Sequence, residues 1–411
     1  MPLRMLAAVW LPFALAYMVS QFYRSVNAVL SPDLVRELQL DPADLGMLTS
    51  AYMASFAAVQ LPLGLLIDSL GPRRVNAALL IVAAVGSSLF ALGHNMATLT
   101  LARALIGFGV SVCLMAAMKA YIQWFPASVI ATLNGWTMAA GGLGALAATA
   151  PVEAALRLTD WRTLFHVISL LTCLVAAFQF WSVPEKKEPR RENWRESIGG
   201  LSVVARDPLF WKMGSLSAMM SGTSMAMLGL WMAPWLRDIA GLARQDIGLM
   251  LALMAASMTM GFAVSGTLAD RLARRGVEPM VLYLAGLGVA IAMLFLIAIG
   301  TTAAVPWIIG LYSFSGGSSQ LVYAMLSRRF PAHLAGLVST ANNMLTFTAA
   351  FAIQWGIGVI INLWPGQGEH YAPAGYRAAF GTMFALQFCA FVVVARARRA
   401  AMRDALPVSS P

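Results

Sequence analysis

The segment GLLIDSLGPRR at residues 64–74 recurs as GTLADRLARRG at residues 266–276, so the two copies start 202 positions apart. Three further pairs keep nearly the same spacing: Pro32 and Pro234, Asp44 and Asp246, and Pro126 and Pro331. The first two of these pairs are again 202 residues apart, and the third is 205 residues apart. The chain of 411 residues is therefore built from two related halves.

The whole chain is strongly apolar. Its residues are 59% hydrophobic and 11% charged, whereas soluble domains carry about 25% charged residues. Mostly apolar runs of about 18 or more residues recur, and each could cross ~30 Å of hydrocarbon as a helix. Twelve spans are predicted, at 6–30, 46–67, 75–93, 99–122, 131–152, 163–183, 209–236, 247–269, 278–300, 304–326, 335–362 and 377–396. The predicted fold class is all-α and integral to a membrane, with twelve transmembrane helices in two six-helix pseudo-symmetric bundles.

The repeat and the charged segment between its copies predict four parts. Residues 1–183 form the N-terminal six-helix bundle, 184–208 a cytoplasmic linker, 209–396 the C-terminal bundle, and 397–411 a cytoplasmic tail. Transporters built from such repeats bind their substrate near the midplane between the repeats. The N-terminal stretch MPLRMLAAVWLPFALA could also be read as a cleavable signal peptide, but the repeat requires it as a full helix.

Basic residues are distributed unevenly over the predicted loops. With the N-terminus in the cytoplasm, nineteen lysines and arginines lie in inner segments and six in outer loops. This asymmetry fits the positive-inside rule, so both termini are predicted to be cytoplasmic, in a bacterial-type inner membrane. Basic inner loops also account for the net charge of +10 without a nucleic-acid partner.

The repeated motif resembles the loop between helices two and three of the major facilitator superfamily, which carries a Gly-x-Leu-x-Asp-Arg-x-Gly-Arg-Arg-like run. The first copy matches it at Gly64, Leu66, Asp68, Gly71, Arg73 and Arg74. The second copy matches it at Gly266, Leu268, Asp270, Arg271, Arg274 and Arg275. Ser69 and Ala273 depart from the pattern. The resemblance covers nearly the whole chain and implies a transporter fold.

Asp68 and Asp270 are predicted to lie at cytoplasmic helix ends, close to basic residues. A carboxylate there is favoured by the positive end of a helix dipole and by charge-assisted hydrogen bonds. If such contacts exist in only one conformation, they act as a cytoplasmic latch. The family resemblance implies that this latch favours the outward-facing state. The alternative is a basic loop that only sets the topology.

The fourth span opens with LARALIGFGVS, in which Gly107 and Gly109 follow Arg103. This run is similar to a second motif of the superfamily, whose arginine is often linked to proton coupling. Two glycines at this spacing also let helices approach closely. Alternatively, Arg103 extends to the nearby outer surface, as long basic side chains do at helix ends.

Arg24 lies inside the first span, where an arginine costs roughly 2.5–3.5 kcal/mol at a helix centre. At ~100° per residue, it shares one helix face with Tyr17, Ser20, Gln21 and Ser31. Its position in the other half is occupied by alanine, so the scaffold does not require this charge. A guanidinium presents a planar fork to a carboxylate or phosphate. We therefore predict that Arg24, with Gln21 and Tyr17, binds an anionic substrate; the alternative is a buried structural cation.

Further cavity residues are predicted elsewhere. Lys119 in the fourth span would supply a second cation nearer the cytoplasm, unless it extends to the inner surface. Gln320, Asn342 and Asn343 would line the cavity from the C-terminal half, although each could instead join two helices by a hydrogen bond. The run FYR followed by PDL is also similar to the first helix of the organophosphate antiporter and anion:cation symporter branches of the superfamily.

These features predict a secondary transporter that works by alternating access on a small organic anion, either a carboxylate or a phosphate ester. The alternatives are an exporter of amphipathic compounds and a transporter-like membrane sensor. The expected partners are the bilayer and the cargo, with the protein a monomer. Coupling could be by anion exchange, by facilitated diffusion, or by symport with a proton on the substrate or on a peripheral acid such as Asp33.

Catalysis has no support in the sequence. It shows no nucleophile–base pair and no phosphate-binding loop, and its three cysteines and four histidines lack metal-ligand spacing. We therefore expect no enzyme activity, no cofactor and no metal.

Overall fold

The computed structural model describes residues 3–184, 194–331, 334–366 and 370–404, and the elements in these ranges are helices. The N-terminal half contains α1 Leu3–Met5, the π-helical η1 Leu6–Trp10, α2 Leu11–Ser25, α3 Asn27–Leu38, α4 Pro42–Ala58, α5 Gln60–Leu70, α6 Pro72–Leu92, α7 Met96–Val110, α8 Cys113–Trp124, α9 Ala127–Ala147, α10 Ala150–Leu156 and α11 Trp161–Ser182. The linker forms α12 Trp194–Arg206. The C-terminal half contains α13 Pro208–Ala226, the π-helical η2 Met227–Trp231, α14 Met232–Asp238, α15 Arg244–Ala273, α16 Pro279–Ala298, α17 Val305–Gly316, the 3-10 η3 Gly317–Gln320, α18 Leu321–Arg329, α19 Ala335–Ile361 and α20 Pro373–Asp404.

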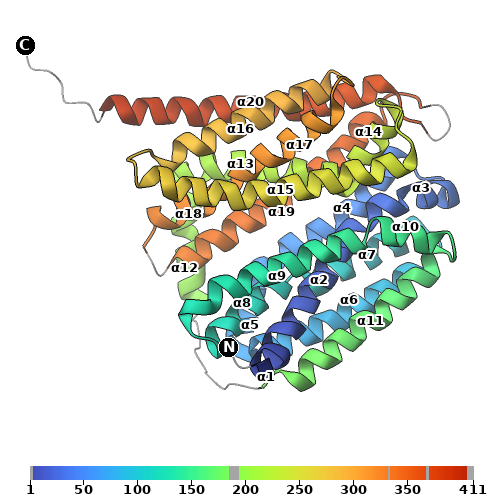
Figure 1. The fold of residues 1–411 in the computed structure, drawn as a ribbon, viewed down its shortest axis with the longest axis horizontal. Coiled ribbons are helices and arrows are strands. Elements are labelled where there is room, and N and C mark those ends of the chain that lie inside the picture. The colour runs from blue at the N-terminus through green and yellow to red at the C-terminus, as the bar shows by residue number, and fades with distance from the viewer. Residues whose placement is uncertain (1–2, 185–193, 332–333, 367–369, 405–411) are drawn as a thin grey trace, which may run out of the picture.

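These helices assemble as two groups, α2–α11 and α13–α20, with α12 at one end of the molecule (Figure 1). Nine helical stretches within the described ranges are long and apolar enough to cross a membrane. The predicted spans 46–67, 209–236 and 304–326 each consist of shorter helices in series. The predicted all-α fold with twelve spans in two bundles is confirmed.

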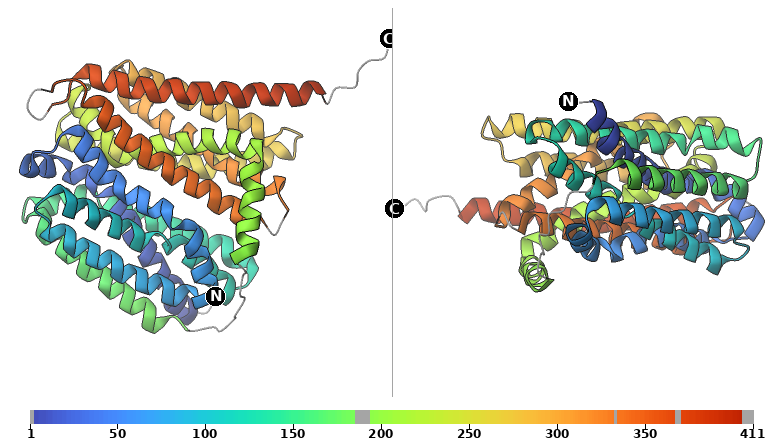
Figure 2. Two further views of the ribbon diagram at one scale, coloured as in Figure 1. Left: turned by 180° about the vertical axis from the view of Figure 1, so that it is seen from behind. Right: turned by 90° about the horizontal axis from the view of Figure 1, so that it is seen from below.

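The two ends of the molecule differ in what they carry. The linker helix α12, the start of α1 and the end of α20 lie at one end, which we call the linker face (Figure 2). We call the opposite end, with the loops that follow α3, α6, α10, α14, α16 and α19, the distal face.

Aspartate and asparagine side chains set where several spans begin. On the distal face, Asp41 accepts a hydrogen bond from the Asp44 N–H at 2.7 Å, which caps α4. Asn95 caps α7 and Asp160 caps α11 in the same way. Such caps satisfy backbone donors that a helix start leaves unpaired.

The first span is interrupted directly after Arg24, because α2 ends at Ser25 and α3 begins at Asn27. Arg103 Nη1 donates to the carbonyl oxygen of Tyr23 at 3.3 Å. In an uninterrupted α-helix that carbonyl would accept from the N–H of residue 27. A side chain that enters the backbone ladder is a known cause of such breaks.

The halves are pressed together at the distal face, where α4 runs antiparallel to α19. A Cβ added to Gly358 would lie 2.3 Å from the carbonyl oxygen of Pro42, so these backbones touch. Asn362 Nδ2 donates to Asp41 Oδ2 at 3.2 Å. On the other side of the molecule, Arg244 of α15 pairs with Glu153 of α10 at 3.2 Å. These contacts close the distal end of the interface.

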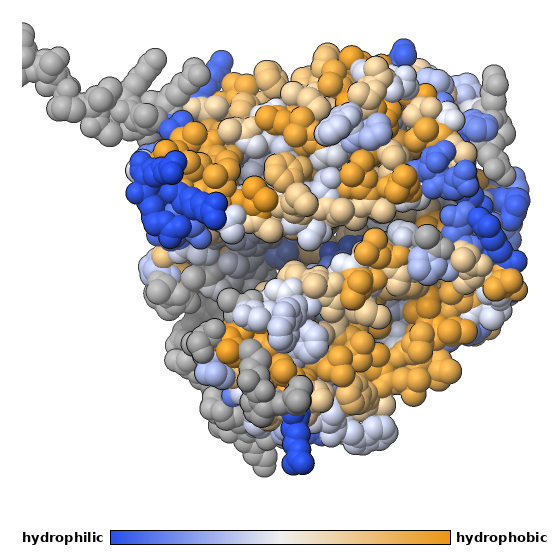
Figure 3. All heavy atoms as spheres, viewed as in Figure 1, coloured by the Kyte–Doolittle hydropathy of each residue, from blue (hydrophilic) through white to orange (hydrophobic). Residues whose placement is uncertain are grey.

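Between the bundles the molecular surface is hollowed. Figure 3 shows a groove between the front helices α9 and α15, with hydrophilic atoms inside it. Within the described residues, no hydrogen bond or ion pair joins α9 to α15 along this groove. The interface is thus closed at the distal face and open along part of its length.

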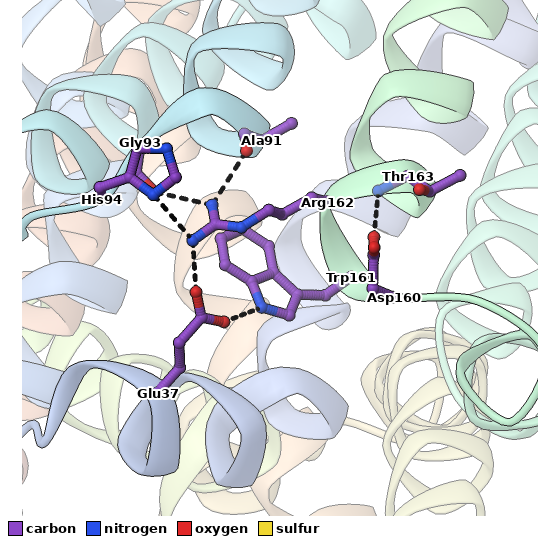
Figure 4. Close-up of polar contacts among 8 residues, drawn as sticks. All are labelled: Glu37, Ala91, Gly93, His94, Asp160, Trp161, Arg162 and Thr163. Atoms are coloured by element: carbon purple, nitrogen blue, oxygen red, sulfur yellow. Dashed lines mark hydrogen bonds and ion pairs between the residues drawn. The ribbon is translucent and has the colours of Figure 1, made fainter.

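In each half, polar contacts also join the end of the first span to the start of the sixth span. Figure 4 shows Arg162, at the start of α11, in an ion pair with Glu37 of α3. Arg162 Nη1 also donates to the carbonyls of Ala91 at 3.0 Å and Gly93 at 2.7 Å. Trp161 Nε1 donates to the second oxygen of Glu37 at 2.7 Å. The end of α3 is therefore fixed against α6 and α11.

In the C-terminal half, Asp238 joins the end of the first span to the start of the last one. It lies two residues beyond the predicted span 209–236. Its carboxylate accepts hydrogen bonds from Arg237 Nε at 2.7 Å, the Tyr371 N–H at 3.1 Å and the Tyr376 hydroxyl at 2.8 Å. Burial raises the pKa of this carboxyl, but the hydrogen bonds lower the pKa by more than burial raises it. The pKa of Asp238 therefore lies below its ordinary value. A carboxyl with a depressed pKa stabilises the fold above its unfolded pKa, and the effect is lost as pH falls through the folded value.

Asp238→Asn is therefore expected to destabilise the protein at pH 7 by about 2 kcal/mol, because it weakens a buried, hydrogen-bonded charge. The difference from wild type should shrink as pH falls below ~4, where the wild-type carboxyl also begins to protonate. Thermal unfolding in detergent at several pH values measures both effects. Asp246→Asn, at an exposed position, is the control and should change stability little. Equal melting temperatures for Asp238→Asn and wild type at pH 7 would contradict this role.

Candidate functional site

Arg24 lies where the first span meets the interface between the halves. Its guanidinium carbon is 5.4 Å from the centroid of the Phe56 ring of α4 and 5.1 Å from that of the Phe347 ring of α19. The two rings stack on each other, with centroids 4.0 Å apart and planes at 21°. The cation therefore contacts one aromatic ring from each half.

No carboxylate of the described residues forms an ion pair with Arg24, and its buried Nε has no hydrogen-bond partner there. The side chain as a whole is partly exposed. Cation–π contacts stabilise a guanidinium, but they leave its N–H donors unused. The group is thus placed to bind an additional acceptor.

Polar side chains flank this cation on both sides of the interface. On α2, Gln21 Nε2 donates to the Tyr17 hydroxyl at 2.5 Å. One turn after Phe56, Gln60 Oε1 accepts from Asn343 Nδ2 at 3.1 Å, which joins α5 to α19 across the halves. Tyr323 of α18 donates to Asn343 Oδ1 at 3.4 Å. Together these groups form an uncharged hydrogen-bonding set around one arginine.

The other predicted cavity residues are placed differently. Asn342 is fully buried in the C-terminal half, with no hydrogen-bond partner for either amide atom, and its Oδ1 lies 3.1 Å from the position of a Cβ on Gly214. Gln320 is half-buried at the end of η3. Lys119 is half-buried on α8 and already interacts with a neighbouring group. The structure thus brings Asn343 to the interface and turns Asn342 away from it.

Arg103 is 1% exposed and sits inside the N-terminal bundle. Its guanidinium carbon lies 5.6 Å from the Tyr52 ring centroid and 5.8 Å from that of Phe90. Tyr52 in turn donates its hydroxyl to the carbonyl oxygen of Ser20 at 3.4 Å. Arg103 and Tyr52 therefore hold two carbonyls of the first span, those of Tyr23 directly before Arg24 and of Ser20 one turn before it. Enclosed in this way, the guanidinium does not extend to the distal surface.

The predicted latch residues lie at the linker face. Gly64 and Asp68 are on α5, but the side chain of Asp68 is outside the described part of the structure. Arg73 packs over the Phe180 ring at 4.7 Å, and Arg74 interacts with a neighbouring group.

In the second copy of the motif, a Cβ on Gly266 would meet open space. The charged residues of this copy are all exposed, and none forms an ion pair within the described chain: Asp270, Arg271, Arg274 and Arg275. The proposed latch stays a prediction.

A partly open cavity of about 250 Å³ lies on the distal side of the interface. Its wall includes Ser31 from the first span, Glu153 and Arg244 from the ion pair between the halves, and Arg237 and Tyr371. Ser31 lies seven residues after Arg24 in the sequence, on the distal side of the interruption at Val26.

The family can be assigned from the sequence. The sequence model described as "Major Facilitator Superfamily" matches residues 13–354. The chain belongs to this superfamily.

Members of known structure share the fold across almost the whole chain. A bacterial homolog of the human lysosomal transporter Spinster, inward-facing and unoccupied, has a TM-score of 0.73 at 16% identity, with 96% of each chain covered. The nucleoside transporter NupG has a TM-score of 0.73 at 14% identity, covering 96% of this chain and 99% of that one.

Superfamily relatives that match in sequence include the probable sulfoacetate transporter SauU of Cupriavidus necator, 25% identical over 64% of both chains. The probable L-galactonate transporter of Escherichia coli K12 is 24% identical, over 64% of this chain and 62% of the relative. The hexuronate transporter of the same strain is 26% identical over 47% of this chain and 44% of the relative. The matched part spans less than two thirds of the length of these relatives.

The sequence analysis did not predict three residues of the candidate site: Phe56, Gln60 and Phe347. A phenylalanine within a membrane span is ordinary, so neither ring gave a signal. Gln60 did give one, since an amide inside the predicted span 46–67 must find a partner in the protein.

Proposed function

We propose that this protein is a secondary transporter that moves a small organic anion across a membrane by alternating access. The observation that carries the proposal is the guanidinium of Arg24, which lies between the two halves without a carboxylate partner in the described chain. A guanidinium drawn partly out of water is more stable when its donors are paired or hydrogen-bonded. An anionic cargo would supply the missing partner through charge-assisted hydrogen bonds.

The named cargoes of the relatives support this chemistry. Sulfoacetate, galactonate and hexuronates all bear acid groups. The sugar acids also carry hydroxyls, which the amides of Gln21, Gln60 and Asn343 and the hydroxyl of Tyr17 could bind. One arginine surrounded by uncharged donors and acceptors suits a small hydroxylated or sulfonated acid better than a large apolar drug.

The positive-inside rule supports placing the linker face in the cytoplasm of a bacterial inner membrane. In that orientation the contacts of Gly358 with Pro42 and of Asn362 with Asp41 close the outer end of the interface. We further propose that residues 1–183 and 209–396 move as the two rocking units, and that the latch motifs close the linker face in the opposite state.

A transport assay with purified protein in proteoliposomes tests the proposal. Radiolabelled galacturonate, galactonate and sulfoacetate should enter, and unlabelled acids should compete. The neutral sugar galactose, which lacks the acid group of galacturonate, should neither enter nor compete. Entry of galactose at the same rate as galacturonate would remove the role of charge. Transport of amphipathic compounds alone would favour the exporter.

A further inference from the structure

The contacts of Arg24 bear on how the carrier changes state. We propose that this protein reorients only with an anion bound at Arg24, and therefore works as an exchanger that trades one anion for another. The inference rests on the proposed function and concerns the energetics of the same site. Two observations support it: the ring pair Phe56–Phe347 and the placement of charge in the spans.

The ring pair joins the two halves directly. Phe56 belongs to α4 and Phe347 to α19. The guanidinium carbon of Arg24 lies 5.4 Å from the centroid of the Phe56 ring and 5.1 Å from that of the Phe347 ring, at the junction of the two halves. The junction lies between the distal contact of Gly358 with Pro42 and the amide pair Gln60–Asn343. Opening the distal face requires α4 and α19 to separate there. Separation would unstack the rings and remove at least one of the two cation–π contacts from Arg24.

Among the described residues, an empty carrier has only uncharged groups near Arg24, and no carboxylate, to replace those contacts. The carboxylates of the described residues lie in loops or near helix ends, and the pairs they form do not include Arg24. An empty carrier that opened would therefore lose cation–π contacts of Arg24 without gaining a charged partner for its guanidinium, which is unfavourable. The ring contacts accordingly hold the empty carrier in the distal-closed state.

A bound anion changes this balance. Charge-assisted hydrogen bonds to a guanidinium are stronger than its contacts with aromatic faces. The anion would draw Arg24 away from Phe56 and Phe347, and the resulting pair carries less net charge. Loaded carriers would thus reorient quickly and empty ones slowly, which is the kinetic condition for exchange. A proton symporter would instead need a titratable group that neutralises the site without cargo.

The test compares entry of radiolabelled galacturonate, and separately of sulfoacetate, into vesicles that are empty or preloaded with the same unlabelled acid. We expect at least tenfold faster entry into the loaded vesicles. Equal rates into empty and loaded vesicles would overturn exchange while leaving the anion transporter intact. Net uptake into empty vesicles driven by an inward proton gradient would also overturn it. No entry of either acid in any condition would instead reject the proposed cargo.

Variants of the ring pair sharpen the test. Phe347→Leu keeps apolar volume but removes one ring, so uptake into empty vesicles should rise several-fold while exchange persists. Phe56→Leu should have the same effect on uptake and exchange, and it replaces Phe347→Leu in the test if that variant does not fold. Phe388→Leu, on the exposed side of α20, is the matched control and should keep the wild-type ratio of loaded to empty rates. Unchanged ratios in both ring variants would show that the rings do not restrain the empty carrier.

Discussion

Replacing Arg24 by alanine is expected to lower the initial rate of anion uptake about 100-fold or more. The variant removes the guanidinium that contacts the Phe56 and Phe347 rings, so the anion would be desolvated without this partner. Losing one side of a buried charge pair typically costs about 3–5 kcal/mol, and each ~1.4 kcal/mol is a factor of ten. Arg24→Lys keeps the charge but loses the planar fork, so it should retain transport with weaker apparent affinity.

Arg36→Ala is the matched control for this prediction. Arg36 lies on the next helix, α3, and is 71% exposed in an ion pair with Asp33 at 2.9 Å. An exposed pair of this kind contributes little to stability, about 0–1 kcal/mol. Uptake by Arg36→Ala should therefore match wild type when expression is equal. If Arg24→Ala also transports at the wild-type rate, Arg24 does not bind the cargo.

Adding a single methyl group at Gly358 is expected to shift the carrier away from its distal-closed state. The new Cβ would lie 2.3 Å from the carbonyl oxygen of Pro42 and 3.0 Å from the Trp231 ring. Because the nearest atom is backbone, α4 and α19 must separate for the methyl to fit. Overpacking of this kind costs about 1–3 kcal/mol, which would change the ratio of closed to open carriers by roughly 5- to 150-fold.

Gly356→Ala provides the control on the same helix, since a Cβ there would have no atom within 4 Å. The readout is alkylation of a cysteine placed at the buried Ser31, which lines the distal cavity, after the three native cysteines are replaced. Gly358→Ala should raise the rate of reaction with an impermeant maleimide at least tenfold and slow uptake. Equal reaction rates in the two glycine variants would mean that the Gly358–Pro42 contact does not close the distal face.

Much of the fold could be read from the sequence, because each span is encoded locally. The predicted span 75–93 compares with α6 at Pro72–Leu92, and 335–362 with α19 at Ala335–Ile361. The breaks within spans were not predictable. The interruption at Val26 accompanies the approach of Arg103 from another helix, and such a tertiary contact leaves no trace in the local pattern.

The site was only partly predictable for the same reason. Arg24 stood out because a charge in a span is costly wherever it points. Asn342 and Asn343 looked equivalent in sequence, yet one residue turns the side chain by about 100° on a helix. As a result Asn343 reaches Gln60 of the other half, whereas Asn342 is buried against α13. Which of two adjacent amides faces the interface depends on helix rotation, and helix rotation depends on packing.

If Arg24 binds the cargo as proposed, it also determines how voltage acts on the carrier. A unit charge that crosses the full membrane field gains or loses about 2.3 kcal/mol per 100 mV. With a monoanion on its guanidinium, the moving site is neutral, so a swap of one monoanion for another would run at the same speed at any potential. A return without cargo would move the bare cation through the field. Current recorded during turnover would then measure how often the carrier returns unloaded.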